Sequence, residues 1–128
     1  MKNFFNGYAA KHFEVSEFDC KCGCGLNNIK PELVRRLDQV REEYGQPIII
    51  NSGCRCPEWN EHEGGKPVSR HLMGRAADLR VLDSSERFQL LQICMKYFNR
   101  IGVYEYCIHV DIDYHPRGIL WVDSKPKK

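Results

Sequence analysis

The sequence predicts an α+β fold, in which helices flank a small antiparallel sheet. Three observations lead to this class. Apolar residues recur at helical spacing between Pro31 and Tyr44, a β-branched run stands between chain-breaking residues at 47–51, and further short apolar runs follow in the second half of the chain. With 128 residues, of which 42% are hydrophobic, the chain is long enough for one core. We therefore expect residues 1–128 to form a single domain.

The first third of the chain divides into a lead-in, a helix and a strand. Residues 1–29 show no regular period and contain cysteines, glycines and asparagines, so we expect an irregular segment that wraps the domain. The helix at 31–44 ends before Gly45 and Pro47, which both stop helices. Its apolar face consists of Leu33, Val34, Leu37, Val40 and Tyr44. The run 47–51 is expected to be a buried strand.

The middle of the chain is rich in glycine and proline. Residues 52–75 contain too many of them for a regular element, and a loop of this length in a compact domain usually carries function. A strand is expected at 76–81, followed by a helix that Ser84 or Ser85 caps and that runs to about Phe98. Two or three closing strands are expected over residues 101–106, 107–113 and 119–122.

Composition excludes several classes of protein. No stretch approaches the roughly 18 consecutive apolar residues of a membrane-spanning helix, and the opening residues lack the apolar run of about 7–15 residues of a signal peptide. We therefore expect no membrane span and a cytoplasmic protein as synthesised. The net charge is only +2, and the basic residues are spread along the chain apart from the cluster at 125–128. Nucleic acid is therefore not an expected partner. We expect residues 123–128 to be a flexible tail and the protein to be a monomer.

Two segments carry the residue types of a catalytic zinc site. Such a site uses three ligands from His, Asp, Glu or Cys and keeps one open position for water. His71 and Asp78 stand in the glycine-rich loop and the strand after it, and His109 follows about thirty residues later. Gly74 allows a tight turn between the first two ligands. The sequence therefore predicts Zn²⁺ bound by His71, Asp78 and His109.

Asp111 is the first candidate for a general base. Residues two apart on a strand project from the same face, so Asp111 is expected beside anything bound at His109. A nearby carboxylate can accept a proton from a metal-bound water as that water attacks a peptide carbonyl. Alternatively, Asp111 orients a neighbouring ligand or arginine.

The pattern Ser-x-His-x-x-Gly-x-Ala-x-Asp at 69–78, followed by His-Val-Asp at 109–111, resembles the zinc D-alanyl-D-alanine carboxypeptidase family. Relatives of that family include VanX-type dipeptidases, phage L-alanyl-D-glutamate endolysins and the metal site of hedgehog domains. Further matches are Ser-Glu-Phe at 16–18, the segment from Pro47 to Pro57, Asn60, and Gly-Gly at 64–65. The resemblance covers roughly residues 13 to 112 and implies a hedgehog/D-Ala-D-Ala peptidase-like fold.

The resemblance also implies roles for single residues. His71, Asp78 and His109 would be the zinc ligands, Arg55 would hold a substrate carboxylate or stabilise the oxyanion, and Ser69 would donate a hydrogen bond to substrate. Many members have a catalytic Glu three residues before the last His, where this chain has Tyr106. The base is then either Asp111, which we favour, or Glu105 through a strand irregularity.

Substrate and setting follow from the same resemblance. We expect hydrolysis of D-Ala-D-Ala or L-Ala-D-Glu bonds in peptidoglycan stem peptides. Without an export signal, such an enzyme reaches the cell wall only when released, as phage or prophage lytic enzymes are. The alternative is a zinc-containing binding module of the same fold that has lost turnover.

Seven cysteines form the remaining pattern. The odd number and the lack of a secretory signal speak against a complete disulfide framework. Cys20, Cys22 and Cys24 lie in the lead-in, and Cys54 and Cys56 flank Arg55. A disulfide or a second, structural zinc site at Cys20, Cys22, Cys24 and Cys56 would tie the lead-in to the active-site loop. Cys94 and Cys107 are expected to be small core residues.

Overall fold

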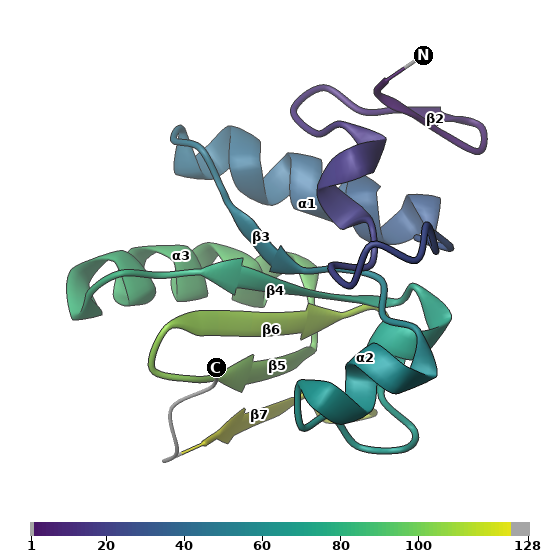
Figure 1. Ribbon diagram of the computed structural model, residues 1–128. Helices are drawn as coiled ribbons and strands as arrows, with labels where there is room; N and C mark the ends of the chain where they lie inside the picture. The colour runs from purple at the N-terminus through teal and green to yellow at the C-terminus, as the bar shows by residue number, and fades with distance from the viewer. Residues whose placement is uncertain (1, 124–128) are drawn as a thin grey trace.

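The computed structural model describes residues 2–123 and has a five-stranded sheet at its centre (Figure 1). The strands lie in the order β3-β4-β6-β5-β7, and a separate two-stranded hairpin, β1-β2, precedes them. The helical elements are η1 (Val15–Phe18), α1 (Pro31–Tyr44), α2 (Pro57–His62), η2 (Arg70–Met73) and α3 (Ser84–Tyr97). The strands are β1 (Phe4–Phe5), β2 (Tyr8–Ala9), β3 (Ile50–Ser52), β4 (Ala76–Arg80), β5 (Arg100–Val103), β6 (Cys107–Asp111) and β7 (Ile119–Val122). The predicted α+β class is confirmed.

The sheet differs from the prediction in one strand pair. β3, β4, β6 and β5 pair antiparallel, whereas β7 lies parallel to β5 at the edge of the sheet. After β6 the chain turns back through residues 112–118, and β7 then pairs with the far edge of β5. Because β7 runs opposite to β6, it runs in the same direction as β5. A strand's partner is set by this long-range return and not by the local pattern of residues 119–122.

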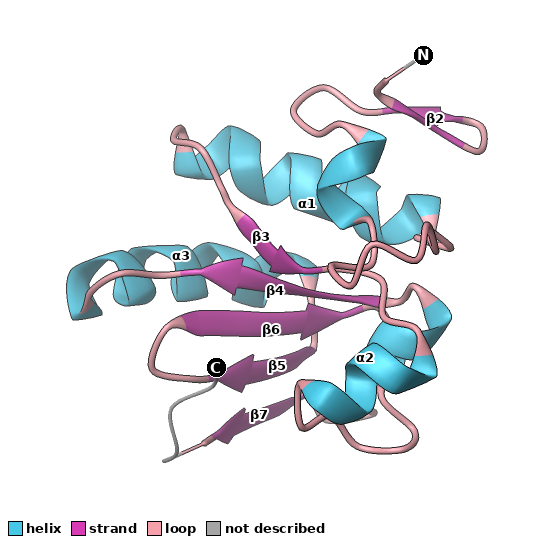
Figure 2. Cartoon of the chain, viewed as in Figure 1, coloured by secondary structure: helices cyan, strands magenta, loops and turns pink. Residues whose placement is uncertain are grey.

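The two faces of the sheet have different partners. Helices α1 and α3 cover one face (Figure 2), against which Ala77 and Leu79 of β4 and Ile108 and Val110 of β6 form the core. Because side chains alternate along a strand, Asp78 and His109 project from the opposite face. All five residues of β6 are buried, so this second face is covered as well.

Helix α1 has the predicted bounds, whereas α3 is capped by a different residue than predicted. Its N-cap is Asp83, whose Oδ1 accepts a hydrogen bond from the N–H of Glu86 at 2.8 Å. Ser84 and Ser85 are instead the first helical residues. Asp is as good an N-cap as Ser, so composition alone does not choose between neighbouring positions.

The glycine-rich segment 52–75 is more regular than predicted. It contains α2 and η2, which are 6 and 4 residues long. Elements this short do not complete the two turns that an apolar period needs to become visible. Pro57 at the start of α2 is the helix signal that the sequence does offer.

The lead-in is likewise only partly irregular, since it contains β1, β2 and η1. Phe5 and Phe18 belong to the core. Asp38 of α1, which is buried, accepts hydrogen bonds from the hydroxyl of Tyr8 and from the N–H groups of Lys11 at 2.9 Å and His12 at 3.0 Å. These contacts fasten the hairpin and the following loop to the helix.

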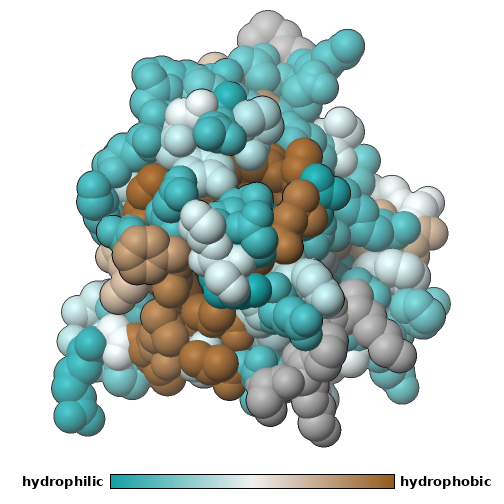
Figure 3. Space-filling view, turned by 90° about the vertical axis from the view of Figure 1, so that its left-hand side faces the viewer, coloured by the Kyte–Doolittle hydropathy of each residue, from teal (hydrophilic) through white to brown (hydrophobic). Residues whose placement is uncertain are grey.

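Some apolar side chains lie on the surface. Ile49, Leu82 and Phe88 are exposed, and Figure 3 shows apolar atoms grouped among hydrophilic ones on one face of the molecule. Among the described residues, no helix has the length and apolar character of a membrane span. Apart from Asp123, the predicted tail at 123–128 lies outside the described residues.

Candidate metal centre

Three predicted ligands converge on the sheet face that the core does not use. His71 lies on η2, Asp78 on β4 and His109 on β6. Asp78 and His109 are direct cross-strand partners. Asp78 Oδ1 lies 3.3 Å from Nε2 of His71 and 3.1 Å from Nδ1 of His109. One ligand atom from each of the three residues thus lies within 4.8 Å of the others.

The surroundings of His71 determine which of its nitrogens faces the centre. The ring is 1% exposed, and Nδ1 lies 2.7 Å from the carbonyl oxygen of Gly53. Because a carbonyl only accepts, Nδ1 carries the hydrogen and Nε2 presents a lone pair to Asp78. Burial lowers the pKa of His71 and so favours this neutral form.

His109 is oriented by a carboxylate on its own strand. Nε2 donates to Oδ2 of Asp111 at 2.9 Å, so Nδ1 presents its lone pair to Asp78. Two imidazole lone pairs and one carboxylate oxygen therefore meet at one point. Such a set repels itself without a cation and has the composition of a catalytic zinc site. The residues fit the metal that the sequence predicts.

Arg55 lies behind Asp78 and is 2% exposed. Its guanidinium donates to Oδ2 of Asp78 at 3.0 Å, to Oγ of Ser52 at 2.9 Å and to Oδ1 of Asn60 at 3.3 Å. Asp78 can thus offer Oδ1 to a metal while Arg55 holds Oδ2. This is the arrangement of a residue that positions a metal ligand.

Asp111 lies behind His109 and is fully buried. Besides His109, its carboxylate accepts hydrogen bonds from Nε of Arg100 at 2.9 Å and from the N–H of Asp113 at 3.2 Å. It therefore bonds to the side of the ring that faces away from Asp78. The geometry favours the alternative in which Asp111 orients a ligand.

Asp113 joins the segments that carry the two histidines. It accepts hydrogen bonds from Nε of Arg70 at 2.8 Å and from Nε of Arg75 at 2.6 Å. Partial burial raises the pKa of Asp113, but the two arginines outweigh it and hold the pKa below its usual value. The ionised carboxylate thus clamps η2 to the end of β6.

Two glycines allow close approaches around the centre. Gly74 has φ +67°, and a Cβ there would lie 2.0 Å from the carbonyl oxygen of Asn28, which confirms the tight turn predicted for it. A Cβ at Gly102 would lie 2.4 Å from the ring of Trp121. That ring packs 5.3 Å from the His109 ring, measured between centroids. A side chain at Gly102 would therefore displace the Trp121 ring that packs against His109.

A cavity of about 310 Å³ lies beside Asp78. Its lining consists of Lys21, Asn51, Ser52, Trp59, Glu63, Asp78, Tyr106 and Cys107. Lys21, Glu63 and Tyr106 lie outside the helices and strands, and among all these residues the sequence predicts a role in the site only for Asp78. Cys107 is buried, as predicted, but it also lines the cavity and shares the sheet face of His109. Cys94 belongs to the core as predicted.

Comparison with family models matches residues 11–113 to the family described as Peptidase M15. This chain is a member of the peptidase M15 family. Membership confirms the predicted resemblance to zinc D-Ala-D-Ala carboxypeptidases and VanX-like enzymes and supports zinc metallopeptidase activity, with a peptidoglycan-related substrate. The search of curated proteins gives no match.

Ser69 and Glu105 are the other residues predicted to take part in M15 chemistry. Ser69 caps η2, and its Oγ accepts the N–H of His71 at 3.2 Å. Glu105 is exposed in the turn between β5 and β6. A hydrogen bond with Glu105 raises the pKa of Tyr106, which lines the cavity. Glu105 is therefore linked to the cavity through its neighbour.

The cysteines form a second group in this M15 chain. The thiol sulfurs of Cys20, Cys22, Cys24 and Cys56 lie within 4.8 Å of one another. Burial raises the pKa of Cys20, but hydrogen bonds from the N–H groups of Cys22 and Cys56 help to lower it to about 7. Hydrogen bonds with Cys24 and Cys20 raise the pKa of Cys22 to about 12. Cys54 lies outside this group, and its thiol donates to Oδ1 of Asn27 at 3.7 Å.

Proposed function

We propose that this M15 protein is a zinc metallopeptidase that hydrolyses D-amino-acid-containing bonds in peptidoglycan stem peptides, of the D-Ala-D-Ala or L-Ala-D-Glu type. The observation that carries the proposal is the convergence of His71 Nε2, Asp78 Oδ1 and His109 Nδ1 beside a cavity. A catalytic zinc site needs three such ligands and an approach for water and substrate.

The residues around the site would prepare it for this reaction. Zinc, when bound, supplies a Lewis acid that polarises a peptide carbonyl and lowers the pKa of water. Arg55 and Gly53 fix Asp78 and His71, and Asp111 fixes His109. Because a hydrogen bond on the side away from the centre already orients each proposed ligand, the side chains need little further ordering when metal and substrate bind.

For the proton acceptor, we propose Glu105 in place of our first candidate, Asp111. Asp111 is buried and bonds to three protein groups, one of which is His109. Glu105 is exposed and is linked through Tyr106 to the cavity. An exposed carboxylate can move toward a bound substrate, whereas Asp111 would first have to give up its partners.

For the substrate carboxylate, we propose Lys21. Arg55 was the expected cation, but its guanidinium is buried and has three protein partners. Lys21 is exposed and lines the cavity together with Asp78. An ammonium group on a flexible stem can reach the terminal carboxylate of a stem peptide. Ser69, at the start of η2, remains the proposed hydroxyl donor to substrate.

The decisive experiment is mass spectrometry of purified stem peptides after incubation with the zinc-loaded protein. Controls are the chelator-treated protein and the His71→Ala variant. We expect release of D-Ala, or of fragments split after L-Ala, only with the zinc-loaded wild type. Intact peptides in the presence of bound zinc would favour a binding module of the same fold. Release from a phage or prophage setting stays a prediction from the resemblance.

A further inference from the structure

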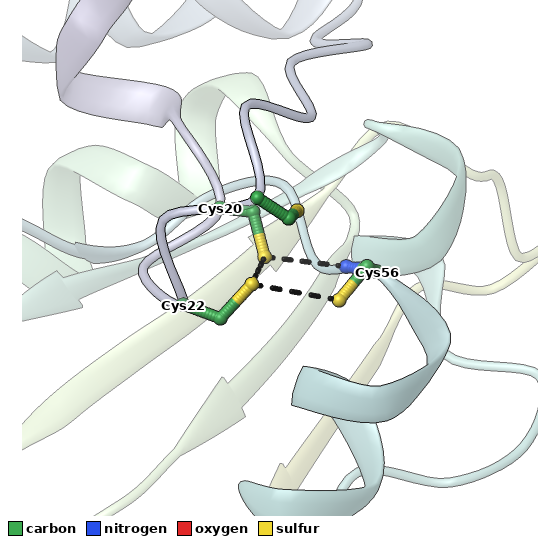
Figure 4. A group of neighbouring side chains, drawn as sticks. Cys20, Cys22 and Cys56 are labelled. Carbon is green, nitrogen blue, oxygen red and sulfur yellow. Dashed lines mark hydrogen bonds between the residues drawn. The ribbon is translucent and has the colours of Figure 1, made fainter.

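We propose that Cys20, Cys22, Cys24 and Cys56 form a second, structural zinc site with four thiolate ligands. The three cysteines of the lead-in follow η1, and Cys56 is the residue before α2. Figure 4 shows Cys20 and Cys22 facing Cys56 across the gap between these two segments. The cluster is separate from the three ligands of the M15 metal centre.

The sulfur separations match a tetrahedral metal site. With a Zn–S distance of about 2.3 Å, the sulfurs of a tetrahedral zinc site lie about 3.8 Å apart. The sulfurs of Cys20 and Cys22 are 3.4 Å apart, and those of Cys22 and Cys56 are 3.7 Å apart. A disulfide requires a distance of about 2.05 Å and joins only two sulfurs. The gathering of four sulfurs therefore indicates a shared metal ion.

Backbone groups of the protein already support negative charge on the sulfurs. The N–H of Cys56 donates to the sulfur of Cys20 at 3.4 Å, and the N–H of Trp59 donates to the sulfur of Cys56 at 3.4 Å. Hydrogen bonds of this kind orient thiolate ligands and offset part of their charge. The second bond also caps α2, so metal binding and helix initiation use the same residue.

The position of the cluster suggests what the metal would do. Cys56 is adjacent to Arg55, which holds Asp78, and Lys21 stands between two of the ligands and lines the cavity. A metal at the cluster would join the lead-in to the active-site loop and keep both residues in place. Its role would be structural, because four protein ligands leave no open position for water.

The test is the zinc content of the full chain, purified under reducing conditions and freed of excess metal. We expect two zinc ions per chain in the wild type and one in Cys22→Ser and Cys24→Ser, whose positions are exposed and tolerate the change. The matched control Cys94→Ala alters a core cysteine outside the cluster and should keep two. His71→Ala should keep one, held by the cysteines.

Cobalt substitution identifies the ligands independently of peptidase activity. Thiolate ligation gives an intense sulfur-to-cobalt charge-transfer band, which we expect in the wild type and in His71→Ala and expect to be lost in Cys22→Ser. One zinc ion in both the wild type and Cys22→Ser, without that band, would overturn the proposal. So would a disulfide among these cysteines in protein purified without reductant, seen as a mass deficit of about two hydrogens with no second metal. Neither result would bear on the proposed peptidase activity.

Discussion

His109 and Asp111, two residues apart on β6, form a hydrogen bond of 2.9 Å between Nε2 and Oδ2. The bond places the ring hydrogen on Nε2 and leaves Nδ1 to face Asp78 at 3.1 Å. One carboxylate thus decides which nitrogen a metal would meet. The opposite tautomer would place a hydrogen between two of the proposed ligands.

The proposed roles of Asp111 and Glu105 are separated by two conservative variants. In Asp111→Asn we expect zinc affinity at this site to fall about 10- to 100-fold, because the partner that orients His109 is weakened. In Glu105→Gln we expect unchanged zinc affinity and a fall in kcat of about 100-fold or more. Zinc titration and steady-state kinetics on each variant check both. Full zinc affinity with a lost rate in Asp111→Asn would return the base role to Asp111.

Removal of a proposed ligand should remove one metal ion. His71→Ala and His109→Ala each leave two of the three converging atoms, which are too few to retain zinc in a catalytic site. We expect each variant to contain one zinc ion fewer per chain than the wild type, measured by elemental analysis. His12→Ala is the control, since His12 is exposed and pairs with Glu42. Loss of zinc in the control variant would show that the assay does not report on this site.

We expect substitution of Arg55 to lower the free energy of unfolding and not to act directly on substrate binding. In Arg55→Ala, Asp78 is left as a buried carboxylate without its cation, and breaking a buried pair in this way costs about 3–5 kcal/mol. We expect the free energy of unfolding of the metal-free protein, measured in urea, to fall by this amount in Arg55→Ala and by less in Arg55→Lys. If Arg55 instead held substrate, Arg55→Lys would raise KM and leave the free energy of unfolding unchanged.

Acid should weaken the clamp between η2 and β6. The pKa of Asp113 is lowered in the folded state, so its contribution to stability is present above its unfolded pKa of about 3.9 and is lost as the pH falls through the folded value. We expect Tm of the metal-free wild type to fall more steeply in that range than Tm of Asp113→Asn. Thermal scans between neutral and strongly acidic pH compare the two. Parallel curves would mean that Asp113 contributes nothing through its charge.

The sequence was enough to predict the helix at 31–44, the strands that carry Asp78 and His109, and the three candidate ligands that the fold brings together. These features depend on local spacing: a helix repeats its apolar face within a few residues, and a strand alternates at every residue. Family motifs also lie in short segments, which is why the resemblance predicted over 13–112 agrees with the family match over 11–113.

How these residues meet depends on long-range contacts that the sequence pattern does not reveal. The parallel edge strand β7, the partners of Arg55 and the cavity lining of Lys21 and Cys107 all depend on contacts between distant segments. The same holds for Cys56 and the cysteines of the lead-in, which are more than thirty residues apart in the chain. Residue types and spacing specify what a segment can bind. The fold specifies which atom points where, because that direction is set by packing across the whole molecule.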